Sequence, residues 1–140
     1  MFWDISPWEE LEALRRQVNE AFGRFGQSSG SYSYPLINVY DTKDDVIVVA
    51  ELAGMKKKDI NVVMNNGVLT LSGKREPFMD EGKAELIRTE RSIGDFEKSF
   101  RIPVKVKEDK INASYSNGIL TITIPKSEEA KPKSIAIDVK

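Results

Sequence analysis

The stretch from Ile111 to Pro125, INASYSNGILTITIP, shows most directly how this chain folds. Its first half alternates apolar and polar residues, as expected for a strand with one face on a core. Asn117-Gly118 is a typical tight hairpin turn, because both residues tolerate the left-handed backbone. The run from Ile119 to Ile124 then returns and ends at Pro125, which cannot donate a ladder hydrogen bond. The stretch therefore predicts a β-hairpin.

The same hairpin design occurs a second time, 51 residues earlier in the chain. The stretch from Ile60 to Leu71 again alternates, turns at Asn66-Gly67 and returns as an apolar run. Two copies are too few for a solenoid. Two explanations are open at this point: either similar hairpins solve the same folding problem independently, or the two hairpins face each other as a matched pair.

Three further stretches have the composition of β-strands. Ile37 and Val39 alternate with polar residues, and the nearly continuous apolar run from Val46 to Leu52 is typical of a strand covered on both faces. A third stretch alternates from Phe96 to Ile102. Together with the hairpins, these strands predict an all-β, immunoglobulin-like sandwich of about seven strands over residues 35–125.

Residues 1–34 form a different region, an amino-terminal arm that holds seven of the twelve aromatic residues. Ser6, Pro7 and Glu9 have the spacing of an N-cap, a first helical residue and a capping box, so they predict the start of a helix. Apolar residues follow at helical spacing and form a stripe of Trp8, Leu11, Leu14, Val18, Phe22 and Phe25. Because a small sandwich already has its own inner face, we expect part of this stripe to remain uncovered and to mark an interaction surface.

Residues 126–140 form a polar tail with one apolar cluster. Ile135, Ile137 and Val139 alternate, so they can point the same way from an extended segment. About nine residues, 126–134, precede the cluster and can stretch to roughly 30 Å, enough to reach a neighbouring chain. The other possibility is that the tail forms a last strand on its own domain.

A long charged excursion separates the first hairpin from the strand that begins near Phe96. About twenty residues leave the sandwich here, with glycine and proline at several positions. Within them, the segment from Ala84 to Glu90 has the pattern of a short strand without an evident partner in its own domain. A loop of this length in a compact domain is usually functional or disordered.

Composition excludes several classes of function. The net charge of -1 gives no long-range field that would attract nucleic acid or an anionic membrane. The chain has no cysteine and no histidine, which excludes disulfides, thiol nucleophiles and histidine-based catalytic relays or zinc sites. We therefore expect no catalytic residues, no metal site and no cofactor. With no apolar stretch near 18 residues and an acidic start, the sequence predicts neither a membrane span nor a secretory signal, and a cytoplasmic location is expected.

Four motifs carry a resemblance to a known family. The chain resembles the α-crystallin domain of small heat-shock proteins over residues 35–137, through LAGMKKKDI, GDFEKSFRIP, the two Asn-Gly hairpins and the Ile135-Ala136-Ile137 tail. Two positions depart from the family pattern. Ala53 stands where the family often has proline, and Lys98 stands where it commonly has arginine, so a bidentate contact of that arginine is in doubt here.

The resemblance implies an ATP-independent holdase chaperone that binds partly unfolded proteins, suppresses their aggregation and assembles through homodimers into large oligomers. It implies a dimer seam in which a strand of Leu86, Ile87 and Arg88 pairs with the partner's edge at Leu36, Ile37, Asn38, Val39 and Tyr40. It also implies a tail anchor of Ile135, Ile137 and Val139, which docks in a neighbour's groove lined by Ile60, Val62, Met64, Ile111 and Ala113.

The arm fits the same interpretation, with two roles that the sequence does not separate. Client binding and packing inside the oligomer would both use the apolar residues Phe2, Trp3, Trp8, Leu11, Leu14, Val18, Phe22 and Phe25. Two other functions fit the sequence less well. A co-chaperone adaptor would lack the tail motif and the long excursion, and a carboxylate-based hydrolase has no residue constellation to support it.

Overall fold

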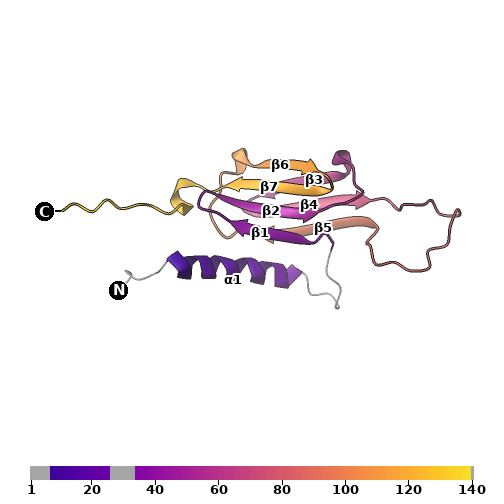
Figure 1. Cartoon of the computed structure of the whole chain (residues 1–140), viewed down its shortest axis with the longest axis horizontal. Helices are drawn as coiled ribbons and strands as arrows, with labels where there is room; N and C mark the ends of the chain where they lie inside the picture. The colour runs from indigo at the N-terminus through magenta and orange to yellow at the C-terminus, as the bar shows by residue number, and fades with distance from the viewer. Residues whose placement is uncertain (1–6, 26–33, 140) are drawn as a thin grey trace.

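The computed structural model describes residues 7–25 and 34–139. Within these residues, seven strands form two antiparallel sheets, and one amino-terminal helix lies beside them (Figure 1). The four-stranded sheet has the order β1 (Ile37–Asp41), β2 (Asp45–Glu51), β7 (Ile119–Pro125) and β6 (Asn112–Ser116). The three-stranded sheet has the order β3 (Ile60–Asn65), β4 (Val68–Arg75) and β5 (Gly94–Arg101). The predicted sandwich is confirmed.

Both predicted hairpins form as the sequence indicates. Asn66 and Asn117 have φ angles of 49° and 53°, and the glycine after each also has a positive φ. This left-handed pair of residues matches the twist of the flanking strands. The first hairpin joins β3 to β4 and the second joins β6 to β7, so the two hairpins lie in opposite sheets, each with one strand at a sheet edge.

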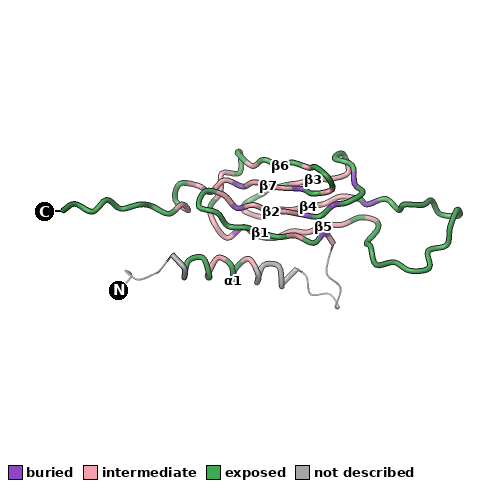
Figure 2. The backbone as a smooth tube through the Cα atoms, viewed as in Figure 1, coloured by how far each residue is buried: buried purple, intermediate pink, exposed green. Residues whose placement is uncertain are grey.

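The core lies between the sheets, where every second side chain of β2, β4 and β7 points inward. Figure 2 shows the buried positions along these central strands. The buried apolar residues are Val46, Val48, Ala50, Leu52, Met55, Leu69, Leu71, Phe100, Ile102, Leu120, Ile122 and Ile124. Because side chains alternate along each strand, one face of each sheet is buried and the other faces solvent or partners.

One detail of β2 differs from the prediction. Its apolar run was expected to be covered on both faces, but Ile47 and Val49 are only half-buried. The reason is that no second layer covers this face. The cross-strand neighbours of Ile47 are Tyr40 on β1 and Thr123 on β7.

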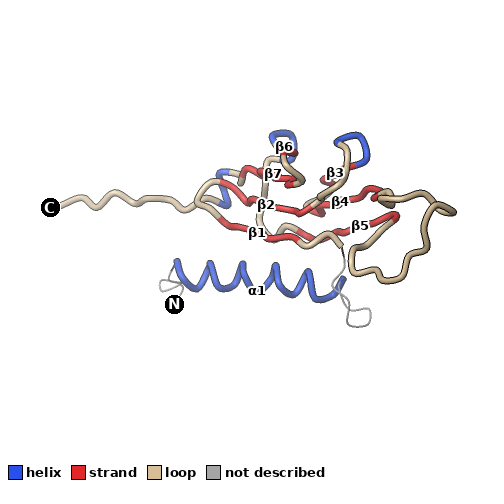
Figure 3. Tube along the Cα trace, turned by 45° about the vertical axis from the view of Figure 1, so that its right-hand side comes forward, coloured by secondary structure: helices blue, strands red, loops and turns tan. Residues whose placement is uncertain are grey.

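The helix α1 (Pro7–Phe25) lies alongside β5 and β1, as the views in Figure 1 and Figure 3 agree. Its described stripe residues are partly covered, since Leu14 and Val18 are half-buried and Leu11 is 39% exposed. The predicted cap Ser6, the aromatic residues Phe2 and Trp3, and the side chains of Trp8, Phe22 and Phe25 lie outside what the structure describes. The described helix is not long and apolar enough to cross a membrane.

Candidate functional site

The excursion between β4 and β5 projects from the sandwich as an exposed loop (Figure 2). Ile87 is 94% exposed and Leu86 is 67% exposed. Within the described part of the chain, the segment 85–93 pairs with no strand. Apolar side chains on an extended segment without a partner are expected to find one on another molecule.

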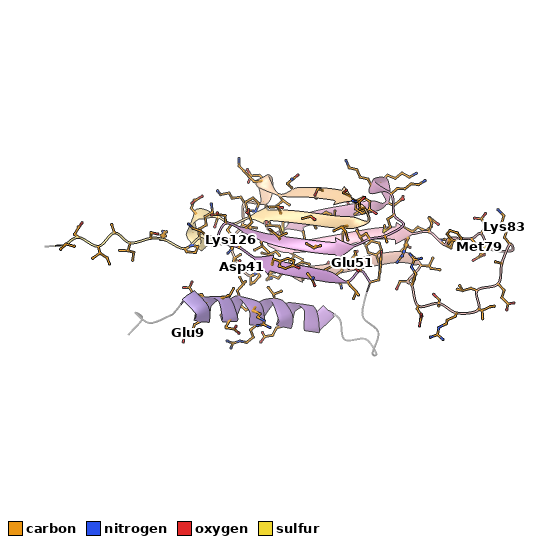
Figure 4. All side chains as sticks on the ribbon, in the orientation of Figure 1. Glu9, Asp41, Glu51, Met79, Lys83 and Lys126 are labelled. Carbon is orange, nitrogen blue, oxygen red and sulfur yellow. The ribbon has the colours of Figure 1, made fainter. Side chains whose placement is uncertain are left out.

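The tip of this loop is held by local contacts. Asp80 accepts a hydrogen bond of 2.9 Å from the Lys83 ammonium, and the Lys83 amide donates to the Asp80 carbonyl. Figure 4 shows Lys83 and Met79 at this tip, far from the sheets. Phe78, beside it in sequence, is 98% exposed. The exposed apolar surface of the loop is therefore larger than the segment Leu86–Arg88 that the sequence indicates.

The outer edge of β1 is the first candidate acceptor for a strand. Among the described strands, β1 is paired with β2 alone, which leaves one side of its backbone open. Ile37 and Val39 point inward and pack against the core, whereas Leu36 is 54% and Tyr40 is 51% exposed. These exposures hold with α1 in place, so the helix does not cover the outward side chains of this edge. An open edge of this kind is a template for strand addition.

The amino end of β1 holds residues that the sequence analysis did not single out. The Tyr34 ring meets the Phe96 ring edge-on, with centroids 5.2 Å apart, and the Arg75 guanidinium carbon lies 4.9 Å from the Tyr34 centroid. Burial raises the pKa of the Tyr34 phenol, and the positive charge of Arg75 opposes part of this rise. Arg75 continues the inward alternation of Leu69 and Leu71 along β4, a signal that was available in the sequence.

Lys98 on β5 makes a further contact with the segment that leads into β1. Its ammonium donates a hydrogen bond of 2.6 Å to the Pro35 carbonyl, just before β1. Partial burial lowers the pKa of Lys98, because a low-dielectric surrounding disfavours the charged form. A lysine thus links the edge of the three-stranded sheet to the edge of the four-stranded sheet.

The two edge strands at the other side of the sandwich carry the predicted anchor-accepting residues. Ile60, Val62 and Met64 alternate along β3, are half-buried and pack against the core, as does Ile111 just before β6. Ala113 is exposed. It lies directly across from the fully buried Ile122, so it belongs to the inward-facing row of β6, but no residue beyond the edge covers it.

The connection from β2 to β3 holds these two edges near each other. The single proton of the Tyr115 hydroxyl on β6 is shared between two carbonyl oxygens, that of Leu52 at 2.7 Å and that of Met55 at 2.9 Å. The apolar rows of β3 and β6 therefore face a common edge of the sandwich, with partly exposed side chains. The structure brings the five predicted acceptor residues to one side, and their role as an acceptor remains a prediction.

The root of the tail is firmly attached, as the labelled pair in Figure 4 shows. The Lys126 side chain is 6% exposed, and its ammonium lies 2.5 Å from an Asp41 carboxylate oxygen and 2.7 Å from the Thr42 carbonyl. The Lys126 amide also donates to the Asp44 carbonyl at 2.8 Å. An ion pair and two hydrogen bonds thus join the root of the tail to the end of β1 and the β1–β2 turn.

Ion pairs extend this attachment by one short 3-10 turn, Glu128–Ala130. Lys105 lies 2.7 Å from Glu129, Lys107 lies 3.0 Å from Glu128, and the Ser127 amide donates to the Lys105 carbonyl. Hydrogen bonds from Lys107 and Lys105 lower the pKa values of Glu128 and Glu129, respectively. Because folding depresses these pKa values, the contribution of the pairs is present at neutral pH and is lost as the pH falls through the carboxylate range.

The tail anchor itself is free of the domain in this chain. Ile135 is 87% exposed, Ile137 is 89% exposed and Val139 is 96% exposed, and Figure 1 shows the segment pointing away from the sheets. The predicted nine-residue tether needs correction, because contacts with the domain continue as far as Lys131, whose ammonium lies 3.9 Å from an Asp44 carboxylate oxygen. Only residues 132–134 remain before the anchor, a reach of about 10 Å. The sequence could not predict the shorter tether, because the ion-pair partners are distant in the chain.

We expect Lys126→Met to destabilise the domain strongly. Removing one partner of a buried ion pair leaves an uncompensated charge, so the free energy of unfolding should fall by about 3 kcal/mol. Lys105→Met is the matched control, because it removes an exposed ion pair and should leave the free energy of unfolding nearly unchanged. Urea denaturation measures both. Equal stabilities of the two variants would contradict the importance of the buried pair.

The described residues contain no group of three or more histidine, cysteine, aspartate or glutamate side chains arranged to hold a metal ion. What the structure does bring together is a set of complementary apolar elements. The exposed strand segment and the exposed anchor each lie on the same chain as a partly uncovered sheet edge. Such an arrangement is suited to association between copies.

Comparisons with known proteins show what this chain is similar to. The profile of the Hsp20/alpha crystallin family matches residues 38–140. The chain is 33% identical to a 17.8 kDa class I heat shock protein of Daucus carota, over 98% of this chain and 84% of that protein. Among solved structures, it is similar to heat shock protein 16.0 from Schizosaccharomyces pombe, with a TM-score of 0.64, 37% identity, and coverage of 79% of this chain and 100% of that one. A small heat-shock protein from Xylella fastidiosa, described as having a distinct high order structure, has a TM-score of 0.62 and 30% identity, over 75% of this chain and 96% of that one.

Proposed function

Because this chain belongs to the Hsp20/alpha crystallin family of small heat-shock chaperones, we propose that it is an ATP-independent holdase, which binds partly unfolded proteins and suppresses their aggregation. In this proposal the protein is not an enzyme, uses no cofactor, acts in the cytoplasm and does not bind nucleic acid. Its partners are other copies of itself and partly unfolded clients.

The observation that carries the proposal is the uncovered apolar surface of a single chain. The excursion, the tail anchor and part of the α1 stripe expose large apolar side chains, more than one sandwich can shield. Hydrophobic attraction is non-directional, so the same surface that binds another copy can bind an unfolded chain of unrelated sequence. Exchange of subunits would expose this surface transiently to clients.

We propose that assembly uses two contacts in succession. The segment Leu86–Arg88 of one chain adds to the open edge of β1 in a second chain and forms a dimer. The tail anchor then docks against the β3 and β6 edges of a neighbouring dimer. The short reach of residues 132–134 supports docking on another chain, since the attached tail root directs the anchor away from its own sheets.

Suppression of aggregation tests the proposal directly. A thermally unstable protein of unrelated sequence is heated with a stoichiometric amount of the full chain, without nucleotide, and light scattering is recorded. We expect most of the scattering to disappear, and adding ATP should change nothing. An unchanged scattering curve at this ratio would contradict the holdase proposal, and an inert globular protein at equal mass serves as the control.

A further inference from the structure

The root of the tail is attached in two parts that differ in burial. The inner part is Lys126, whose side chain is 6% exposed and pairs with Asp41. Main-chain hydrogen bonds from the amides of Lys126 and Ser127 to the domain support it, at 2.8 and 2.9 Å. In residues 128–131, by contrast, the described main-chain hydrogen bonds stay within the 3-10 turn, so side chains tie this outer part of the root to the domain.

Three ion pairs hold the outer part of the root in place. They are Lys105–Glu129 at 2.7 Å, Lys107–Glu128 at 3.0 Å and Lys131–Asp44 at 3.9 Å. In each pair the carboxylate side chain is more than 60% exposed. Exposed pairs are individually weak and are screened by salt, whereas a buried pair is screened much less. Added salt should therefore release the outer part of the root while Lys126 stays bound.

Release of the outer part lengthens the free tether of the tail anchor. With the outer part attached, residues 132–134 precede the anchor and reach about 10 Å. With it released, residues 128–134 are free and reach roughly 23 Å. Once a tether spans the gap to its site, the local concentration of the anchor falls as about the −3/2 power of tether length, which is about 3.5-fold here. For a dimer that is held by two tails, the combined effect is roughly tenfold.

We propose that Glu128 and Glu129 are positioning residues of the tail anchor, because their ion pairs with Lys107 and Lys105 form a clamp that keeps the tether short and that ionic strength opens. An open clamp leaves the anchor intact but lowers its local concentration at the neighbouring chain, so subunits leave the assembly more often. The clamp thereby sets how often subunits exchange and expose their apolar surface to clients. This inference rests on the proposed docking of the tail on a neighbouring dimer.

The first test measures subunit exchange in the full chain. Isotopically labelled and unlabelled assemblies are mixed at low salt, and native mass spectrometry follows the appearance of mixed assemblies. The double variant Glu128→Gln/Glu129→Gln should exchange roughly tenfold faster than the unaltered chain. Glu81→Gln/Glu85→Gln is the matched control, because it removes two exposed carboxylates from the excursion, and its exchange rate should stay within about 2-fold. An unaltered exchange rate in the Glu128/Glu129 variant would overturn the inference.

Salt dependence tests the electrostatic origin of the clamp. Raising the NaCl concentration from about 0.01 to about 0.15 M shortens the Debye length from about 30 to about 8 Å. We expect the unaltered chain to exchange faster at the higher concentration and to approach the rate of the Glu128/Glu129 variant. The rate of the variant should change by less than about 2-fold. The same salt dependence in both chains would contradict a clamp made of these ion pairs.

Exchanging the two charges of one pair separates positioning from a general structural effect. Glu129→Lys alone places two ammonium groups together and should speed exchange. Adding Lys105→Glu restores an ion pair of opposite polarity, and the exchange rate should return to within about 2-fold of the unaltered value. Thermal unfolding checks that the domain is equally stable in these variants. A double variant that remains as fast as Glu129→Lys would reject the pair as part of the clamp.

Failure of the clamp can be distinguished from failure of tail docking. If changing Ile135 and Ile137 to alanine reduces the assembly to dimers while the Glu128/Glu129 variant exchanges at the unaltered rate, the tail contact stands and only the clamp is wrong. If the isoleucine variant keeps the full mass, the tail is not the contact between dimers, and the clamp is rejected with it.

Discussion

Changing Ile135 and Ile137 together to alanine is expected to reduce the assembly to dimers without unfolding the sandwich. Both side chains are almost fully exposed in the single chain, so their removal takes nothing from its own core. Burying each isoleucine in a neighbour is worth roughly 1.5–3 kcal/mol before ordering costs, so a single tail binds weakly. Many tails hold together by avidity, and losing all of them at once should collapse the oligomer.

Native mass and thermal unfolding together check this prediction. The double variant should have the mass of a dimer and an unfolding temperature close to that of the unaltered domain. Asp138→Ala is the matched control, because it changes the same exposed tail but leaves the anchor residues in place, and it should keep the full assembly. An unchanged mass in the double variant would show that the tail is not the contact between dimers.

Deleting Ala84–Arg91 is expected to have the second large effect, conversion of the dimer to a monomer. Apart from an isolated β-bridge between Ala84 and Glu81 within the loop, the segment pairs with no strand of the described domain, so the sandwich should remain folded. What the deletion removes is the strand that we propose adds to the partner's β1 edge, where main-chain hydrogen bonds supply most of the affinity. Measuring the mass in the tail double variant isolates this step from oligomer assembly.

A second variant separates the strand from the length of the loop. Replacing the same eight residues with glycine and serine keeps the loop length but removes the β-forming side chains. We expect this variant to be monomeric as well. Dimers that persist in both variants would place the seam elsewhere on the molecule, and the exposed Phe78–Met79 tip would be the next surface to alter.

Much of the fold was predictable because its signals are local. The Asn-Gly turns are decided by the backbone preferences of adjacent residues, and the inward rows of β2, β4 and β7 follow from a period of two. Most of the predicted edge and acceptor residues lie on β1, β3 and β6, and Leu36 and Ile111 lie immediately before β1 and β6. The covering of β2 was not predictable, since whether a second layer lies over Ile47 and Val49 depends on the other elements of the molecule.

For the tail too, some features were predictable from the sequence and others were not. Its apolar alternation and its polar approach are visible in the sequence, and they predict an anchor on a tether. The length of that tether was wrong, because Lys126 contacts Asp41 and Thr42 and Lys131 lies beside Asp44, and more than 80 residues separate these partners in the chain. No pattern within the tail indicates such a contact.

The sequence by itself determined the hairpins, the strand faces and the exposed apolar segments, because each depends on residues a few positions apart. Only the tertiary structure decided that the tail root is held by a buried ion pair, and that the Arg75 guanidinium stacks on the Tyr34 ring. Both follow from how distant strands come together when the two sheets close on one core. Pairing and burial of charge depend on proximity in space, and the spacing of residues along a chain does not specify it.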